Sequence, residues 1–144
     1  MSTVAVDVEP NVVRQVFPNW SITIPSTLRE TFVEEDAYWH AWDRRRSVSL
    51  TSMLVADRRG RPVSSRKILK QFPVEPGQRV AMPPGLLGWA VAMTPPPPAR
   101  AARAISGIVI RDGGLLIATV TADDLGWAET IWRSIRRHPS PGPW

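Results

Sequence analysis

Two β-rich runs near the end of the chain, joined by an Asp-Gly turn, constrain the fold more than any other feature of the sequence. The runs cover residues 103–110 and 115–120, and Arg111-Asp112-Gly113-Gly114 connects them. Asp-Gly in a short connection favours a primed hairpin turn, because both central residues of such a turn need a positive φ. The sequence therefore predicts a C-terminal β-hairpin.

A helix is expected directly after this hairpin. Thr121-Ala122-Asp123-Asp124 matches a capping box, and the helical pattern runs to about Arg137. Cations favour the C-terminal end of a helix, where we place Arg133, Arg136 and Arg137. The apolar residues of this amphipathic helix fall on one face, namely Leu125, Ala128, Trp132 and Ile135.

Alternating apolar residues predict strands earlier in the chain. In Trp20-Ser21-Ile22-Thr23-Ile24 every second residue is apolar, so Trp20, Ile22 and Ile24 are expected to share a buried face. Residues 47–56 form a second such pattern. It places Val48, Leu50 and Leu54 on one face and the small hydroxyls on the other, from Ser47, Ser49 and Thr51.

The middle of the chain is read as two further strands and two helices. Residues 78–82 predict a brief strand, residues 86–93 a half-buried strand, and residues 63–72 a short helix with Ser64 or Ser65 near its start. Residues 26–43 also favour a helix, because Glu30 stands three residues after a possible cap at Thr27. Its apolar stripe is Leu28, Phe32 and Val33, while Trp39 and Trp42 fit a helix or a loop.

Together these elements predict an α+β fold with a mainly antiparallel β-sheet flanked by helices. The 144 residues, 43% hydrophobic, suit one domain over 17–138, with an N-terminal strand or arm over 1–16 and a flexible Pro-rich tail over 139–144. Residues 95–98 are four prolines, which cannot donate to a ladder, so we expect a loop or rigid spacer there. No apolar stretch fits a membrane span, and no secretory signal is evident, so we expect a cytoplasmic protein.

The charge is unevenly distributed. Residues 1–36 carry six acids and two bases, whereas the remaining residues carry sixteen bases and seven acids. Sixteen of the eighteen bases are arginine, whose planar guanidinium group suits carboxylate and phosphate partners. A coding bias towards arginine is the more favoured explanation of the same excess, because alanine and proline are abundant as well.

Several chemistries lack the residues that they need. The chain has no cysteine and only two histidines, without metal-ligand spacing, so no metal site and no cofactor are expected. No nucleophile elbow and no phosphate-binding glycine loop is present. One polar corner could act as a general acid-base or small-molecule site, formed by Asp36, His40 and Asp43. Such a mixture is more often a packed aromatic corner, so an enzyme is the less favoured hypothesis.

A basic segment with aromatic neighbours gives a second functional alternative. Its cations are Arg44, Arg45, Arg46, Arg58, Arg59, Arg61, Arg66, Lys67 and Lys70, with Trp39 and Trp42 alongside. Cations that neutralise phosphates and rings that stack on bases are what single-stranded nucleic acid requires. No zinc-finger spacing and no RNP signature accompanies them.

Six of the seven tryptophans separate into two groups by their predicted positions. Trp20, Trp89 and Trp132 are expected in the core, whereas Trp39, Trp42 and Trp127 are the candidates for an exposed groove. Because tryptophan and arginine dominate the energetics of protein interfaces, we favour a protein-binding surface. Its candidate residues are Tyr38, Trp39, Trp42, Arg44, Arg45 and Arg46, and the partner is another protein or a second copy of the chain.

The order of elements resembles that of the PsbP-like superfamily. The resemblance rests on Trp20-Ser21-Ile22-Thr23-Ile24-Pro25, on the Asp112-Gly113-Gly114 turn leading to Thr119-Val120-Thr121, and on Ile131-Trp132-Arg133-Ser134-Ile135 in the last helix. It covers roughly residues 17–138 and implies an antiparallel sandwich with helices on its faces. It also implies a mostly non-catalytic, protein-binding use, as in an adaptor or chaperone-like subunit. The proline run departs from the pattern, and no functional residue is carried over.

Overall fold

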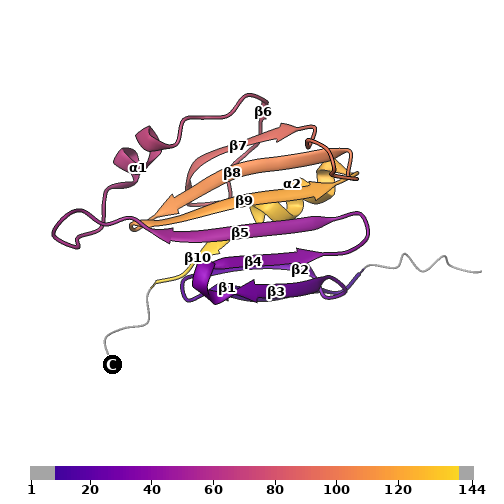
Figure 1. The fold of residues 1–144 in the computed structure, drawn as a ribbon, viewed down its shortest axis with the longest axis horizontal. Coiled ribbons are helices and arrows are strands. Elements are labelled where there is room, and N and C mark those ends of the chain that lie inside the picture. The colour runs from indigo at the N-terminus through magenta and orange to yellow at the C-terminus, as the bar shows by residue number, and fades with distance from the viewer. Residues whose placement is uncertain (1–8, 140–144) are drawn as a thin grey trace, which may run out of the picture.

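The computed structural model describes residues 9–139, and its fold is α+β with mostly antiparallel sheet (Figure 1). The large sheet has seven strands in the order β3-β4-β5-β9-β8-β7-β6, and a smaller one has the order β1-β2-β10. The strands are β1 (Asn11–Phe17), β2 (Trp20–Pro25), β3 (Arg29–Val33), β4 (Tyr38–Trp42), β5 (Ser47–Leu54), β6 (Gln78–Arg79), β7 (Leu87–Met93), β8 (Arg103–Arg111), β9 (Gly114–Ala122) and β10 (Arg136–Arg137). The helices are η1 (Glu34–Asp36), a 3₁₀ turn, and the α-helices α1 (Ser65–Gln71) and α2 (Leu125–Arg133).

The centre of the large sheet is formed by β5, β9 and β8. β8 and β9 pair in antiparallel register from Arg103 opposite Ala122 to Arg111 opposite Gly114. Asp112 and Gly113 join them with φ values of 52° and 74°, the primed geometry that an Asp-Gly pair favours.

No helix in the described part of the chain is long and apolar enough to cross a membrane.

The main core lies between the two sheets, and α2 closes it on the same side. Trp20, Ile22 and Ile24 are almost fully buried there, which confirms the shared face predicted from their alternation. Trp132 of α2 is also buried, and its indole Nε1 donates to the carbonyl of Ala81 at 2.9 Å. Gly107 leaves room for this ring, because a Cβ there would lie 2.7 Å from it.

A second, smaller core lies on the opposite face of the large sheet, which we call the outer face. Ile68 of α1 is buried there against apolar residues of β7, β8 and β9. The helix begins as predicted, with the Ser64 side chain accepting from the backbone of Lys67. Trp89 is buried as predicted, and its Nε1 donates to the carbonyl of Phe72 at 2.9 Å.

The helix predicted over residues 26–43 is wrong. This segment forms β3, η1 and β4, because β4 pairs along its whole length with both β3 and β5. Thr27 is not a helix cap, since its hydroxyl donates to the carboxylate of Glu9. Ala37 leaves η1 with a φ of 47°, a left-handed conformation that ends any helical run.

The ends of two other elements also differ from the prediction. The Asp124 side chain caps α2 by accepting from Gly126, so Thr121 is not the cap. The helix ends at Arg133, and Arg136 and Arg137 form strand β10 against β2 instead of extending it. Arg137 lies over the Trp20 ring, 4.8 Å from its centroid.

Leu54 corrects the prediction for β5. It follows the alternation of Val48 and Leu50, which are fully buried, yet its side chain is 78% exposed. The reason is its position at the end of the strand, where it lines an open pocket beside β1.

Candidate functional site

The outer face of β4 carries a row of three aromatic side chains. Strand alternation places Tyr38, His40 and Trp42 on this face, each of them half-buried. His40 and Trp42 stack with centroids 4.8 Å apart and planes 20° apart, and Tyr38 lies 6.1 Å from His40. Partial burial lowers the pKa of His40 below its ordinary value, so the imidazole is neutral at pH 7 and packs as an aromatic ring.

Trp39 does not belong to this surface, which corrects its prediction as an exposed contact residue. It points to the inner side of the sheet with Ala41 and is only 4% exposed. Its register partner on β3 is Phe32, and the two line a shallow cavity together. Trp39 is therefore a core residue.

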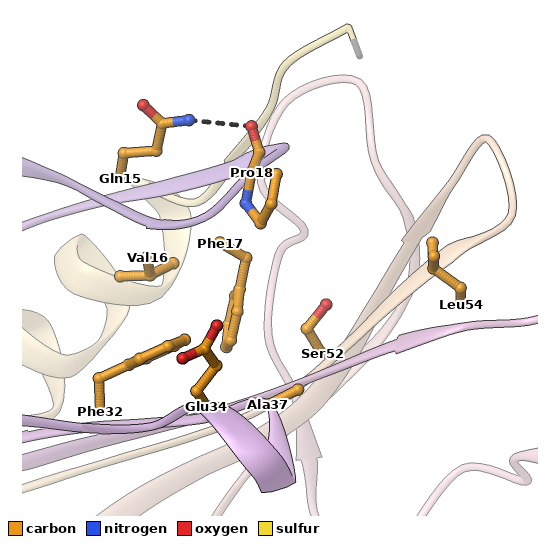
Figure 2. A pocket seen from close by; sticks show the side chains of 9 residues that line it. All are labelled: Gln15, Val16, Phe17, Pro18, Phe32, Glu34, Ala37, Ser52 and Leu54. Carbon is orange, nitrogen blue, oxygen red and sulfur yellow. Dashed lines mark hydrogen bonds between the residues drawn. The ribbon is translucent and has the colours of Figure 1, made fainter. Parts of the chain in front are cut away.

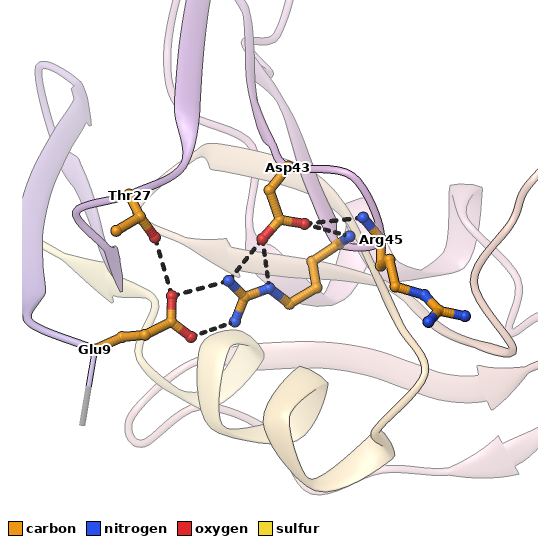
Figure 3. Close-up of polar contacts among 5 residues, drawn as sticks. Glu9, Thr27, Asp43 and Arg45 are labelled. Carbon is orange, nitrogen blue, oxygen red and sulfur yellow. Dashed lines mark hydrogen bonds and ion pairs between the residues drawn. The ribbon is translucent and has the colours of Figure 1, made fainter. Parts of the chain in front are cut away.

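The Arg46 side chain is also a structural one, because it bonds carboxylates from two segments of the chain (Figure 3). Its Nη1 and Nη2 donate to the two carboxylate oxygens of Glu9 at 2.7 and 2.9 Å, and its Nε donates to Asp43 at 2.8 Å. Glu9 accepts in addition from the Thr27 hydroxyl at 2.9 Å. The guanidinium group lies over the ring of Trp127, 4.8 Å from its centroid. These contacts tie the residues before β1, the β4–β5 connection and α2 together.

This cluster changes the protonation equilibria of its two carboxylates. Hydrogen bonds from Arg46 and then from Thr27 lower the pKa of Glu9. Partial burial alone would raise the pKa of Asp43, but the bonds from Arg46 and from two backbone amides outweigh it and lower that pKa. Both carboxylates are thus held ionised, and Arg46 is held as their counter-charge.

The polar corner of Asp36, His40 and Asp43 does not converge. Asp36 ends η1 before β4, and Asp43 follows the other end of the strand, about 17 Å away along five extended residues. Asp43 is bonded to Arg46, whereas His40 faces outward between its aromatic neighbours. Within residues 9–139, no group of three or more potential metal ligands is found.

Three arginines line a cleft of about 530 Å³ beside the β4–β5 connection, and we call them the cationic end. They are Arg44 and Arg45, and Arg100 from the loop before β8. Arg45 pairs with Asp123 at 3.0 Å, whereas Arg44 and Arg100 have no hydrogen-bonding or ionic partner within residues 9–139. Of the predicted arginine triplet, Arg44 and Arg45 therefore line the cleft, and only Arg44 has no partner within residues 9–139.

A pocket of about 620 Å³ opens between β1 and the β3 edge of the large sheet (Figure 2). We call it the edge pocket, and its lining is Gln15, Val16, Phe17, Pro18, Phe32, Glu34, Ala37, Ser52 and Leu54. Sequence reasoning missed it because it assigned a helix to the β3 segment. Two apolar residues of the lining, Phe32 and Leu54, are exposed in the structure, and no motif in the sequence marks them as part of a pocket.

The structure also joins Ser21 to His138, 117 positions apart. The Ser21 hydroxyl lies 2.7 Å from His138 Nε2, beside a cavity of about 490 Å³. The backbone amide of His138 donates to the Asn19 carbonyl at 2.8 Å. No carboxylate pairs with this imidazole within residues 9–139, and the bond links the residue after β10 to β2.

The sequence was compared with protein-family models and with curated proteins. No protein-family model matches the sequence, and no curated protein matches it significantly. The surfaces described above are therefore the basis for a functional assignment.

Proposed function

We propose that this chain is a protein-binding module of PsbP-like sandwich type, with its C-terminal hairpin and amphipathic helix, and that it docks an acidic segment of a partner protein at the cationic end. The observation that carries the proposal is the cleft lined by Arg44, Arg45 and Arg100. Three cations gather there, and only one has an acidic partner within residues 9–139. Guanidinium groups bind carboxylates as planar forks, so acidic side chains are the matching chemistry.

The aromatic row of β4 extends this surface. Trp42 directly precedes the β4–β5 connection and is half-buried, and Arg29 of β3 lies opposite it in the register. Protein interfaces concentrate their binding energy in tryptophan, tyrosine and arginine. The contact surface is therefore the exposed part of the predicted set, Tyr38, Trp42, Arg44 and Arg45, with Arg29 and Arg100 added.

Two observations favour a protein over a nucleic acid as the partner. The predicted basic segment is divided, because Arg44 and Arg45 precede β5 whereas Arg58 and Arg59 follow its far end. One ring face of Trp42 is already occupied by His40, so at most one face of this ring is left to stack on a base. A short acidic segment fits this local cleft better than a continuous phosphate backbone does.

Charge reversal at the cationic end tests the proposal. The probe is a synthetic peptide with alternating glutamate and leucine, and its binding is measured by fluorescence anisotropy at physiological salt. Arg44→Glu combined with Arg100→Glu is expected to weaken binding at least tenfold. Arg58→Glu combined with Arg59→Glu is the matched control, since it removes the same charge from exposed positions in another loop and is expected to change affinity less than threefold.

Two results would overturn the proposal. An equal loss in both double variants would mean that net charge, and not the cleft, attracts the peptide. Tighter binding of a single-stranded oligonucleotide, weakened by both double variants, would assign the surface to nucleic acid.

A further inference from the structure

The edge pocket lies where the two sheets separate at one side of the sandwich. The end of β1 and the following turn form one wall, with Phe17 and Pro18. The opposite wall comes from β3, η1 and β5, with Phe32, Glu34 and Leu54 (Figure 2). Its volume of about 620 Å³ falls within the range of roughly 300–1,000 Å³ that is typical of small-molecule sites.

The lining of this pocket is mainly apolar. The Phe17 and Phe32 rings meet across it with centroids 5.7 Å apart and planes 55° apart. Phe32 remains 49% exposed and Leu54 78% exposed, so both still present apolar surface to a ligand. Covering that surface with an apolar body is favourable, because apolar area is removed from water.

One charged group lines the pocket, and it is acidic. Figure 2 shows the Glu34 carboxylate directed towards the Phe17 and Phe32 rings. This side chain has no hydrogen-bonding or ionic partner within residues 9–139. The amide of Gln15, the other long polar side chain, already donates to the Pro18 carbonyl at 2.9 Å.

We infer that the edge pocket binds a small organic cation with an aromatic or alkyl body, its ammonium group placed at Glu34. A carboxylate and the partly exposed Phe32 ring both attract an ammonium ion, while the apolar walls accept the rest of the molecule. Glu35 and Asp36 continue the negative charge along η1. The edge pocket and the cationic end share no lining residue, so this inference does not rest on the proposed function.

Three probes with one body test the charge preference. They are 4-phenylbutylamine, 4-phenylbutanol and 4-phenylbutyrate, titrated into the full chain by isothermal titration calorimetry. The amine is expected to bind about fivefold more tightly than the alcohol, the scale of a partly exposed ion pair, and the carboxylate is expected to bind most weakly. Equal affinity for amine and alcohol would overturn the inference.

Neighbouring glutamates provide a matched pair of variants. Glu34→Gln is expected to abolish the preference for the amine over the alcohol and to leave the affinity for the alcohol unchanged. Glu35→Gln removes the same charge from a residue that does not line the pocket, so most of the preference should remain. Both side chains are exposed, and neither change threatens folding. If the two variants lose the preference equally, the acidic turn as a whole, and not Glu34, attracts the cation.

Discussion

The inner and outer sides of the β4–β5 hairpin use the same residue types for different purposes. On the inner side, Trp39 is buried and Arg46 bonds two carboxylates. On the outer side, Trp42 is half-buried, and in the connection that follows it Arg44 has no partner within residues 9–139. Residue type alone therefore does not separate a structural side chain from one that is free to bind.

Two factors decide which of these side chains are structural: the alternation of side chains along a strand, and which neighbouring segments of the chain lie close by. Trp39 and Trp42 differ by an odd number of positions, so an extended strand directs them to opposite faces. Arg46 meets Glu9 because the chain before β1 passes on the inner side, whereas the loop before β8 brings a third arginine to the cationic end. Substitutions on the two sides should therefore have separable effects on stability and on binding.

The largest expected difference is between the two tryptophans. Trp39→Ala removes a buried ring from the main core and is expected to lower the free energy of unfolding by about 3–5 kcal/mol. Trp42→Ala removes a half-buried ring and its stacking on His40, for an expected loss of about 1–2 kcal/mol. Urea denaturation followed by far-UV circular dichroism measures both. Equal losses would remove the distinction between the two sides.

Some strands of this fold could be predicted from the sequence and others could not. The strand at Trp20, Ile22 and Ile24 was predictable, because its alternation matches burial on one face. β3 was not, since all five of its residues are exposed and its pairing with β4 is invisible to a local pattern. Apolar spacing within Leu28, Phe32 and Val33 imitates a helix, and only the non-local pairing decides against it.

The candidate site was predictable in part for the same reason. Once β4 is known to be a strand, parity alone separates Trp39 from Tyr38 and Trp42. The ion pair of Arg46 with Glu9 joins residues 37 positions apart, and no local sequence pattern predicts such a contact. Arg100 joins the cationic end from a separate loop, which likewise requires the three-dimensional structure.

The adjacent arginines give a smaller but sharper test. Arg46→Met keeps the aliphatic stem and removes the guanidinium group, with its bonds to Glu9 and Asp43 and its contact with the Trp127 ring. We expect a loss of about 1–2 kcal/mol, since both carboxylates are partly exposed and water can solvate them. Arg45→Met, which breaks only an exposed ion pair, should change stability by less than about 0.5 kcal/mol. A comparable loss from both variants would contradict the assignment of Arg46 alone to the fold.

Acid should reveal the smallest effect on the inner side. The pKa values of Glu9 and Asp43 are lower in the folded than in the unfolded chain, so the unfolded chain binds more protons as the pH falls. Their contribution is complete above the ordinary carboxyl pKa of about 4 and is lost as the pH falls through the lower folded values. The stability difference between the unmodified chain and Arg46→Met should therefore shrink between pH 7 and pH 3. Urea midpoints at both pH values measure it, and a difference that stays constant would mean that Arg46 stabilises the hairpin through packing on Trp127 instead of through its carboxylates.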